Sequence, residues 1–273
     1  MTSRRPFRHV TFTLGVLLTV ALIVVAALSL VWTPTDPLAM SIAARLQPPS
    51  AAHPFGTDHY GRDVLARVMA GARTSIAVGV IAVAIGAIAG VLLGVVSGYA
   101  GGWPDEILMR VSDAVQGFPA ILAALLFAAV FGPGVVMSMV AIGIAFVPAF
   151  ARLARGSVLE LRGRDFVVAA HALGAGDGRV LVRHILPNTL APLIVQATTS
   201  FPVAILAEAG LAYLGLGTQP PQPSWGSMLK DAQNFLSLNP SFALFPGGAI
   251  AVTVLGLNLW GDGLRDLLDP KTA

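Results

Sequence analysis

The chain has 273 residues, of which 55% are hydrophobic and only 11% are charged, with a formal net charge of +3. Its mean hydropathy of +0.77 is too high for a soluble domain of this size, so the composition predicts a membrane protein. The sequence contains no cysteine, which excludes disulfides and cysteine-ligated metal or iron–sulfur sites.

Six apolar segments are long enough to cross the roughly 30 Å hydrocarbon core of a bilayer. In chain order they cover residues 10–32, 74–98, 115–131, 135–153, 189–214 and 242–260. The third is short, and its helix is expected to begin earlier, near Ile107. The first follows a basic start that resembles a signal peptide, but its apolar run is too long for one. The sequence therefore predicts an all-α membrane protein whose six helices leave both termini on one side.

The positions of arginine and lysine predict the orientation of these spans. A cytoplasmic N-terminus puts twelve basic residues in inside segments and five in outside segments, as the positive-inside rule requires. The inside residues are Arg4, Arg5, Arg8, Arg110, Arg152, Arg155, Arg162, Arg164, Arg179, Arg183, Arg265 and Lys271, and the outside residues are Arg45, Arg62, Arg67, Arg73 and Lys230. The nominal pI of 9.8 thus reflects topology, and no nucleic-acid partner is expected.

The first two spans are joined by an outside connector, because residues 33–54 are rich in proline and alanine. Between Asp63 and Arg73, apolar residues at helical spacing fit two structures. One is a separate amphipathic helix at the membrane interface, and the other is the first turns of the second span.

A row of glycines marks the second span, where Gly86, Gly90, Gly94 and Gly98 recur at intervals of four and share one helix face. Small residues in this pattern favour close packing against a neighbouring helix. A substrate groove lined by bare backbone is the alternative.

Charged residues at residues 105–113, before Phe118-Pro119, recur at helical spacing and predict local ion pairs. They are Asp105, Glu106, Arg110 and Asp113.

The polar segment between the fourth and fifth spans predicts two short helices. Asp165 is expected to cap the first helix, which Gly174 and Gly176 end. Asp177 is expected to cap the second, which Pro187 stops.

This segment has the composition of a docking surface. Ala169 and Ala170 would let a partner approach the backbone closely, while Arg179 and Arg183 supply positive charge. An ordinary loop whose helices pack on their own bundle is the alternative.

Two residues near the predicted outer surface have alternative roles. Glu208 is the only charged residue well inside a span, and such acids contact cationic substrates, relay protons or serve structural hydrogen bonding. Its position near the outer end of the fifth span favours the structural role. Trp225, in the outside loop of residues 217–240, is expected to anchor at the lipid headgroups or to contact an extracellular delivery protein.

No residue pattern predicts chemistry in this chain. The sequence has no Gly-Lys pair and therefore no Walker A loop for ATP. Its five histidines are not spaced as metal ligands, and no Ser/His/Asp arrangement is attached to a nucleophile elbow. We expect no catalytic residue, no metal site and no bound cofactor.

Four dispersed motifs carry a family resemblance between Gly56 and Pro270. They are Gly56-Thr57-Asp58 with Gly61-Arg62-Asp63-Val64-Leu65; Ala169-Ala170 with Gly174 and His184-Ile185-Leu186-Pro187-Asn188; Tyr213-Leu214-Gly215-Leu216-Gly217 through Gln219-Pro220-Pro221-Gln222-Pro223-Ser224-Trp225-Gly226; and Asn258 with Gly261-Asp262-Gly263-Leu264-Arg265-Asp266. In this order they resemble permease subunits of ABC importers, in the dipeptide, oligopeptide and nickel branch. One position departs from the pattern, because the family usually has Glu before the alanine pair and this chain has Val168.

The resemblance implies the type I importer permease fold, with six transmembrane helices and cytoplasmic termini. Residues 1–73 would hold the tail, first span and connector, residues 74–266 the permease core, and residues 267–273 a cytoplasmic tail. The core would contain a cytoplasmic coupling loop at residues 154–188. The residues implied in ATPase coupling are Asp165, Ala169, Ala170, Gly174, Arg179, Arg183, His184 and Pro187.

The resemblance also implies partners in a bacterial cytoplasmic membrane. These are a similar but non-identical permease, one or two cytoplasmic ATPase subunits that bind ATP and Mg, and an extracellular or periplasmic solute-binding protein. The expected function is ATP-driven import of dipeptides or oligopeptides, with nickel chelates as the alternative substrate. The rivals are an ion-driven secondary transporter and a membrane scaffold or receptor; the former predicts inverted repeats and midplane charges, and the sequence has no detectable repeat and one Glu.

Overall fold

The computed structural model describes the backbone of residues 5–268 and the side chains of residues 10–267. Within this range the regular elements are helices, with one isolated bridge between Thr57 and Asp63. The helices are α1 (Arg5–Val31), a 3₁₀ turn (Ile42–Ala44), α2 (Val64–Ala100), α3 (Gly102–Gly117), α4 (Ala120–Phe131), α5 (Val135–Leu161), α6 (Asp165–Ala172), α7 (Asp177–Val180), a π turn (Leu181–Ile185), α8 (Leu186–Tyr213), α9 (Trp225–Ala232), a 3₁₀ turn (Gln233–Phe235) and α10 (Ser241–Leu268).

Among the described residues, five helical runs are long and apolar enough to cross a membrane, and α3 with α4 form a sixth, bent pair. This confirms the all-α membrane fold. The expected single third helix is wrong, because α3 and α4 meet at an angle of 87°. Pro119 disfavours helical backbone at Phe118, whose φ of −91° and ψ of 125° are extended, so the helix breaks there.

The residues after Asp63 form the first turns of the second span and not a separate interfacial helix. The Asp63 side chain caps α2 by accepting a hydrogen bond from the Ala66 backbone N–H at 2.8 Å. From there α2 continues without a break for 37 residues.

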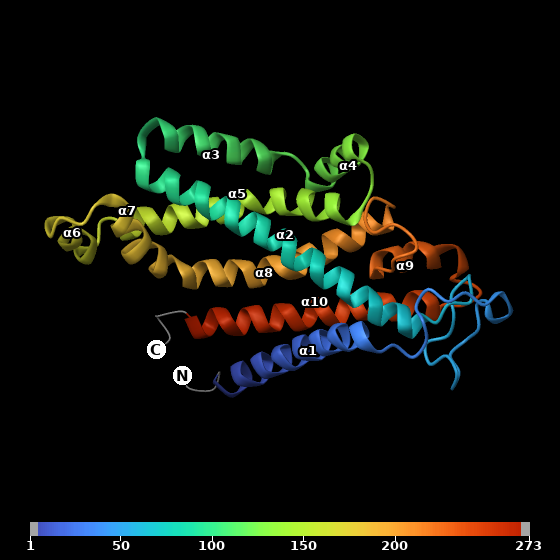
Figure 1. Cartoon of the computed structure of the whole chain (residues 1–273). Coiled ribbons are helices and arrows are strands. Elements are labelled where there is room, and N and C mark those ends of the chain that lie inside the picture. Colours follow the sequence, from blue (N-terminus) through green and yellow to red (C-terminus); the bar gives the residue numbers. More distant parts are fainter. Residues whose placement is uncertain (1–4, 269–273) are drawn as a thin grey trace.

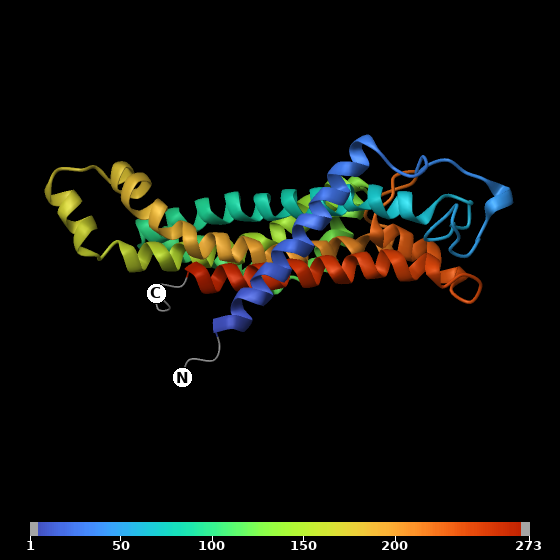
Figure 2. The ribbon, with the colours of Figure 1, turned by 90° about the horizontal axis from the view of Figure 1, so that it is seen from below.

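The helices form an elongated bundle with two distinct ends (Figure 1). The α6 end carries α6 and α7, the start of α1 and the close of α10. The α9 end carries α9 and the connector of residues 32–63. Figure 2 shows α6 and α7 projecting beyond the bundle and α1 crossing α10 obliquely.

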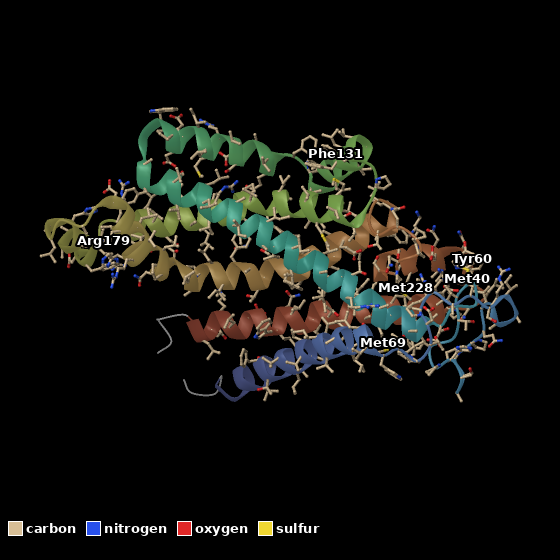
Figure 3. The ribbon with its side chains drawn as sticks, in the orientation of Figure 1. Met40, Tyr60, Met69, Phe131, Arg179 and Met228 are labelled. Atoms are coloured by element: carbon tan, nitrogen blue, oxygen red, sulfur yellow. The ribbon has the colours of Figure 1, made fainter. Side chains whose placement is uncertain are left out.

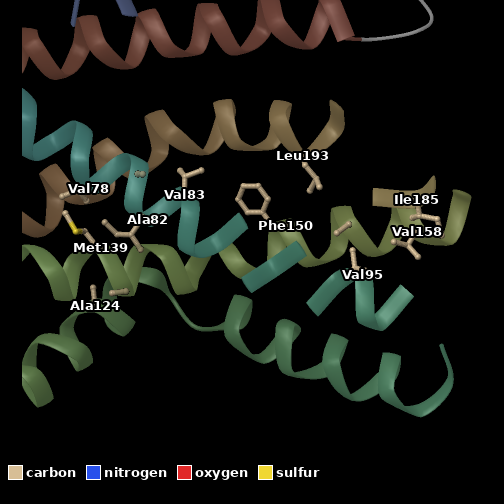
Figure 4. Packing of buried hydrophobic residues seen from close by; sticks show 14 of the residues in the cluster. Val78, Ala82, Val83, Val95, Ala124, Met139, Phe150, Val158, Ile185 and Leu193 are labelled. Atoms are coloured by element: carbon tan, nitrogen blue, oxygen red, sulfur yellow. The ribbon is translucent and has the colours of Figure 1, made fainter. Parts of the chain in front are cut away.

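The packing of α2 on α5 forms the centre of the bundle and contains the four glycines. A Cβ atom added at Gly90 would lie 2.6 Å from the Phe150 Cβ and from the Val147 carbonyl oxygen. The other three glycines of the row also face α5, since an added Cβ at each would meet α5 atoms first. Phe150 is fully buried in the resulting core, among side chains of α2, α5 and α8 (Figure 4).

Small residues also bring α1 onto α10. An added Cβ at Gly256 would lie 2.7 Å from the Leu18 Cβ, and one at Gly263 would meet the Phe12 ring. This close contact places the beginning of α1 beside the final turns of α10.

The α9 end is closed by a buried cluster of charged side chains. Asp58 is fully buried, and its Oδ1 accepts hydrogen bonds from the Tyr60 and Arg62 backbone N–H groups at 2.8 and 2.9 Å. Its Oδ2 accepts a hydrogen bond from the Arg62 side chain at 2.6 Å and lies 3.5 Å from Arg67 Nε. The Gly56–Asp63 motif therefore forms a compact loop, held by buried hydrogen bonds and ion pairs, at the start of α2.

Trp225 is neither a headgroup anchor nor an exposed contact. Its side chain is only 1% exposed, and its indole N–H donates to the Val68 carbonyl oxygen at 3.0 Å. Ser224 caps α9 and begins it at this tryptophan. The indole is buried because it fills the space over Gly71, where an added Cβ would lie 3.1 Å from the ring.

Candidate coupling surface

Residues 165–187, here called the coupling surface, form a helical hairpin that is fixed to the bundle by three aliphatic side chains. Val167, Val180 and Ile185 are at most 1% exposed. They belong to the same buried cluster as Val158 of α5, so the hairpin is anchored directly to that helix. The coupling surface is therefore a rigid extension of the bundle.

The turn that closes α6 has the hydrogen bonds of a Schellman motif. The Gly174 N–H donates to the His171 carbonyl at 2.9 Å, and the Ala175 N–H donates to the Ala170 carbonyl at 3.0 Å. Gly174 has a φ of +83°, and an added Cβ would meet nothing within 4 Å. Glycine is needed here for its backbone conformation and not for space.

Apolar side chains cover much of the exposed face. Leu173 is 89% exposed, and Val168 and Phe166 are also exposed. The sequence pattern did not predict the exposure of Leu173. Its position directly before Gly174 could have shown it, because a left-handed residue turns the chain away and leaves its neighbour at the tip. Ala169 is exposed as well, while Ala170 is half-buried against the core.

The two expected aspartate caps are wrong. Arg164 is the N-cap of α6 and Gly176 that of α7, and neither makes a side-chain capping bond. Asp165 and Asp177 are the first helical residues, where a negative charge still faces the positive end of the helix dipole. Asp177 has a different partner, because its Oδ1 accepts a hydrogen bond from the Tyr99 hydroxyl at 2.7 Å.

Pro187 does not stop the second helix. The helical run continues from Asp177 to Tyr213, and Pro187 lies in the first turn of α8. The π turn Leu181–Ile185 comes just before it. A π turn changes the hydrogen-bond register, which accommodates a proline that lacks an N–H and crowds the preceding turn.

The cations of the coupling surface are free of ion pairs among the described residues. Arg179 and Arg183 are both exposed, and Arg179 lies at the projecting tip in Figure 3. His184 is half-buried, and its carbonyl oxygen accepts a hydrogen bond from the Asn188 side chain at 2.6 Å. The structure thus brings all the proposed coupling residues into one hairpin.

Charged side chains near the α6 end tie helices together. Arg155 donates two hydrogen bonds to Asp105, at 2.6 and 2.7 Å, and the Ser97 hydroxyl donates to the same carboxylate. These contacts join α5, α3 and α2. Asp113 lies 3.3 Å from Arg152 of α5. The expected local ion pairs are therefore wrong for these two aspartates, because both reach across to another helix.

Glu208 lies far from the coupling surface. It is on α8 about 30 Å along the helix axis from Pro187. Its side chain is fully buried, and its Oε2 accepts a hydrogen bond from the Ser75 hydroxyl at 3.3 Å. Its Oε1 has no hydrogen-bond partner among the described residues.

Comparisons with known proteins agree with this architecture. Residues 90–273 match the family described as the binding-protein-dependent transport system inner membrane component. The chain is 45% identical over 257 residues to the dipeptide transport system permease protein DppC of Alkalihalophilus pseudofirmus, covering 94% of this chain and 84% of the relative. It is 49% identical over 223 residues to the glutathione transport system permease protein GsiD of Escherichia coli, covering 82% and 74%.

Similarity to a solved structure supports the fold. A chain of the inward-facing MetNI methionine ABC transporter matches with a TM-score of 0.57 and 17% identity, covering 76% of this chain and 96% of that one. The family consists of membrane subunits, and the apolar helices make this chain a multi-pass protein of the bacterial cytoplasmic membrane. The chain belongs to the family of binding-protein-dependent transport system inner membrane components.

Proposed function

We propose that this chain is the permease subunit of an ATP-driven importer of short peptides. It would form half of the translocation pathway with a second, non-identical permease, and would be driven by cytoplasmic ATPase subunits that bind ATP and Mg. An extracellular or periplasmic solute-binding protein would deliver the substrate. The relatives named for dipeptide and glutathione transport support the substrate class.

The observation that carries this proposal is the rigid and exposed coupling surface. Its exposed apolar residues, Leu173 and Val168, suit burial against another protein. Arg179 and Arg183 stand beside them without ion pairs among the described residues, ready for acidic groups. Val168 replaces the glutamate usual at its position, so contact there would be apolar.

The way in which the coupling surface is connected to the membrane spans supports a lever mechanism. It is continuous with α8 and linked to α5 by a short turn, so a force on α6 reaches both spans. The glycine contact between α2 and α5 and the Asp105–Arg155 pair extend the rigid unit to two more helices. Movement of the ATPases would therefore tilt these spans instead of bending a flexible loop.

The basic residues support a cytoplasmic position for the α6 end. This end carries Arg152, Arg155, Arg162, Arg164, Arg179 and Arg183, and the beginning of α1 lies at the same end. On the positive-inside rule we propose that both termini lie in the cytoplasm and the α9 end lies outside.

Reconstitution tests the proposal. The chain is inserted into liposomes with its partner permease, ATPases and solute-binding protein, and uptake of labelled dipeptides and of nickel chelates is measured. We expect ATP-dependent uptake of peptide, lost when the Walker A lysine of the ATPase is replaced. Uptake by this chain alone, driven by an ion gradient, would contradict the proposal, and uptake of nickel chelates alone would correct its substrate.

We propose a structural role for Glu208. Its hydrogen bond with Ser75 joins α8 to α2, and full burial keeps it from solvent. Glu208→Gln is expected to leave uptake per transporter within about twofold and to lower the amount of folded protein. The exposed Glu160→Gln variant is the control. A loss of uptake in Glu208→Gln at normal protein level would instead assign this acid to the substrate pathway.

A further inference from the structure

A cavity of about 230 Å³ with charged side chains in its wall lies at the α9 end. Its walls come from the connector, the beginning of α2, the loop after α8 and α9. Tyr60 and Met40 form the connector wall, and Figure 3 shows both close to α9. Both side chains are exposed, so the cavity is accessible from the surface of this end.

Two buried polar atoms in its wall lack hydrogen-bond partners among the described residues. Arg67 is 2% exposed; its Nε makes no hydrogen bond but lies 3.5 Å from Asp58 Oδ2, and another nitrogen of its guanidinium donates to the Pro37 carbonyl at 3.3 Å. Thr218 is 6% exposed, and its Oγ1 has no partner either. Because the Arg67 Nε already faces Asp58, it is the Thr218 hydroxyl that favours an acceptor inside the cavity, since a buried hydroxyl is costly when left unpaired.

The charges around the cavity leave one positive charge in excess. Arg62, Arg67 and Lys230 line it, and the only carboxylate in its wall is that of Asp231. Asp58 lies behind the two arginines and pairs with both. Lys230 has no ion pair among the described residues. Three cations thus face two carboxylates, and one further carboxylate would balance them.

The arrangement favours a carboxylate over a cation or water. A cation would be repelled by the uncompensated charge of the exposed Lys230, whereas a carboxylate would gain an ion pair with Lys230 as well as the hydrogen bond of Thr218, and water could supply only the hydrogen bond. Asp231 lies 3.8 Å from Arg62, which leaves Lys230 as the cation without a carboxylate partner among the described residues. Carboxylates accept hydrogen bonds from guanidinium, ammonium and hydroxyl donors together.

We propose that this cavity is a carboxylate-binding site in which Arg67, Thr218 and Lys230 hold the ligand. The carboxylate would come from the C-terminus of a transported peptide or from an acidic side chain of the delivery protein. The choice between these sources rests on the proposed function, whereas the site itself does not.

The test measures binding to the full chain, purified with its partner subunits in lipid nanodiscs, by titration calorimetry. Glycylglycine supplies a terminal carboxylate, N-acetylglutamic acid α-amide supplies a side-chain carboxylate, and glycylglycinamide supplies none. We expect one or both carboxylates to bind and the amide not to bind. Binding of the first favours the peptide as source, and binding of the second alone favours the delivery protein.

Variants assign the binding to the cavity. Thr218→Val and Lys230→Gln are each expected to weaken carboxylate binding about tenfold. Arg73→Gln is the matched control, since Arg73 lies on α2 but does not line the cavity. The variants also avoid Arg67, whose loss would disturb the buried cluster.

Two results would overturn the inference. One is equal binding of the amide and the acids, or no binding at about 10 mM, by correctly folded protein. The other is carboxylate binding that neither variant changes. ATP-dependent uptake is followed in the same preparation, so intact uptake without carboxylate binding rejects this site alone, and the reverse result rejects only the proposed function.

Discussion

At the α6 end, Arg179 and Arg183 are exposed and form no ion pair among the described residues. At the α9 end, Arg62 and Arg67 are buried beside Asp58, and backbone groups complete its hydrogen bonds. The first end presents its cations and apolar side chains outward, while the second uses charge to hold its own fold. Arginine thus indicates a partner surface where it is exposed, at the α6 end, and a structural cluster where it is buried, at the α9 end.

The largest effect is expected from the buried cluster. Asp58→Ala removes the carboxylate between Arg62 and Arg67 and leaves two buried cations without it, at a cost of about 3–5 kcal/mol in the free energy of unfolding. Reversible unfolding in mixed micelles measures this difference. The exposed Asp165→Asn at the α6 end is the control and should change stability by less than about 0.5 kcal/mol. Equal effects would erase the contrast between the ends.

The packing of α2 on α5, which lies between the two ends, is tested at Gly90. Gly90→Ala forces a methyl group against Phe150 and the Val147 carbonyl, so we expect a loss of about 1–3 kcal/mol. Gly156→Ala on α5 adds the same methyl group where nothing lies within 4 Å, and should be neutral or stabilising by up to about 1 kcal/mol. Thermal unfolding in detergent compares them. A stable Gly90→Ala protein with altered substrate affinity would favour a groove over packing.

A charge at the tip of the coupling surface should act on assembly and not on folding. Leu173→Glu puts a carboxylate into an apolar contact, and we expect the retention of ATPase during purification to fall about tenfold. Leu238→Glu is matched to it, because Leu238 is also an exposed leucine but lies at the α9 end. It should retain the ATPase fully. Equal losses in both variants would show that the effect is not specific to the coupling surface.

The smallest effect is a pH dependence at the α9 end. Burial lowers the pKa of His59 below its ordinary 6.5, with Asp231 and Asp58 acting to raise it and Arg62 and Arg67 to lower it. The folded state therefore favours the neutral ring, and this stability is present above pH 6.5 and lost as the pH falls toward the lower folded pKa. After solvent screening we expect less than about 1 kcal/mol.

His59→Phe isolates this contribution, because it keeps a ring near Phe235, whose centroid lies 5.2 Å away. Melting temperatures at pH 7.5 and 5.5 should differ less in this variant than in the wild type. An unchanged difference would assign the pH dependence to other groups.

The sequence predicted several features of this protein from local information. Hydropathy predicted five spans as single helices and also located the sixth apolar segment, although not its bend. This is possible because crossing a bilayer needs a long apolar run wherever it lies in the chain. The glycine row marked one face of α2, since a period of four follows from helix geometry alone. Gly174 ends α6 as expected, because a left-handed turn needs only its own residue type.

Only the tertiary structure decided what these features meet. Whether Trp225 touches lipid or protein depends on Gly71 and Val68, which are far from it in sequence. Asp105 pairs with Arg155, which is 50 positions away in the sequence, and not with the charged residues of its own helix. Pro187 lies within a continuous helix because the π turn before it changes the hydrogen-bond register and so accommodates a residue without an N–H. Helix type and span follow from short-range geometry, whereas burial and ion pairing depend on which distant surfaces the packed helices bring together.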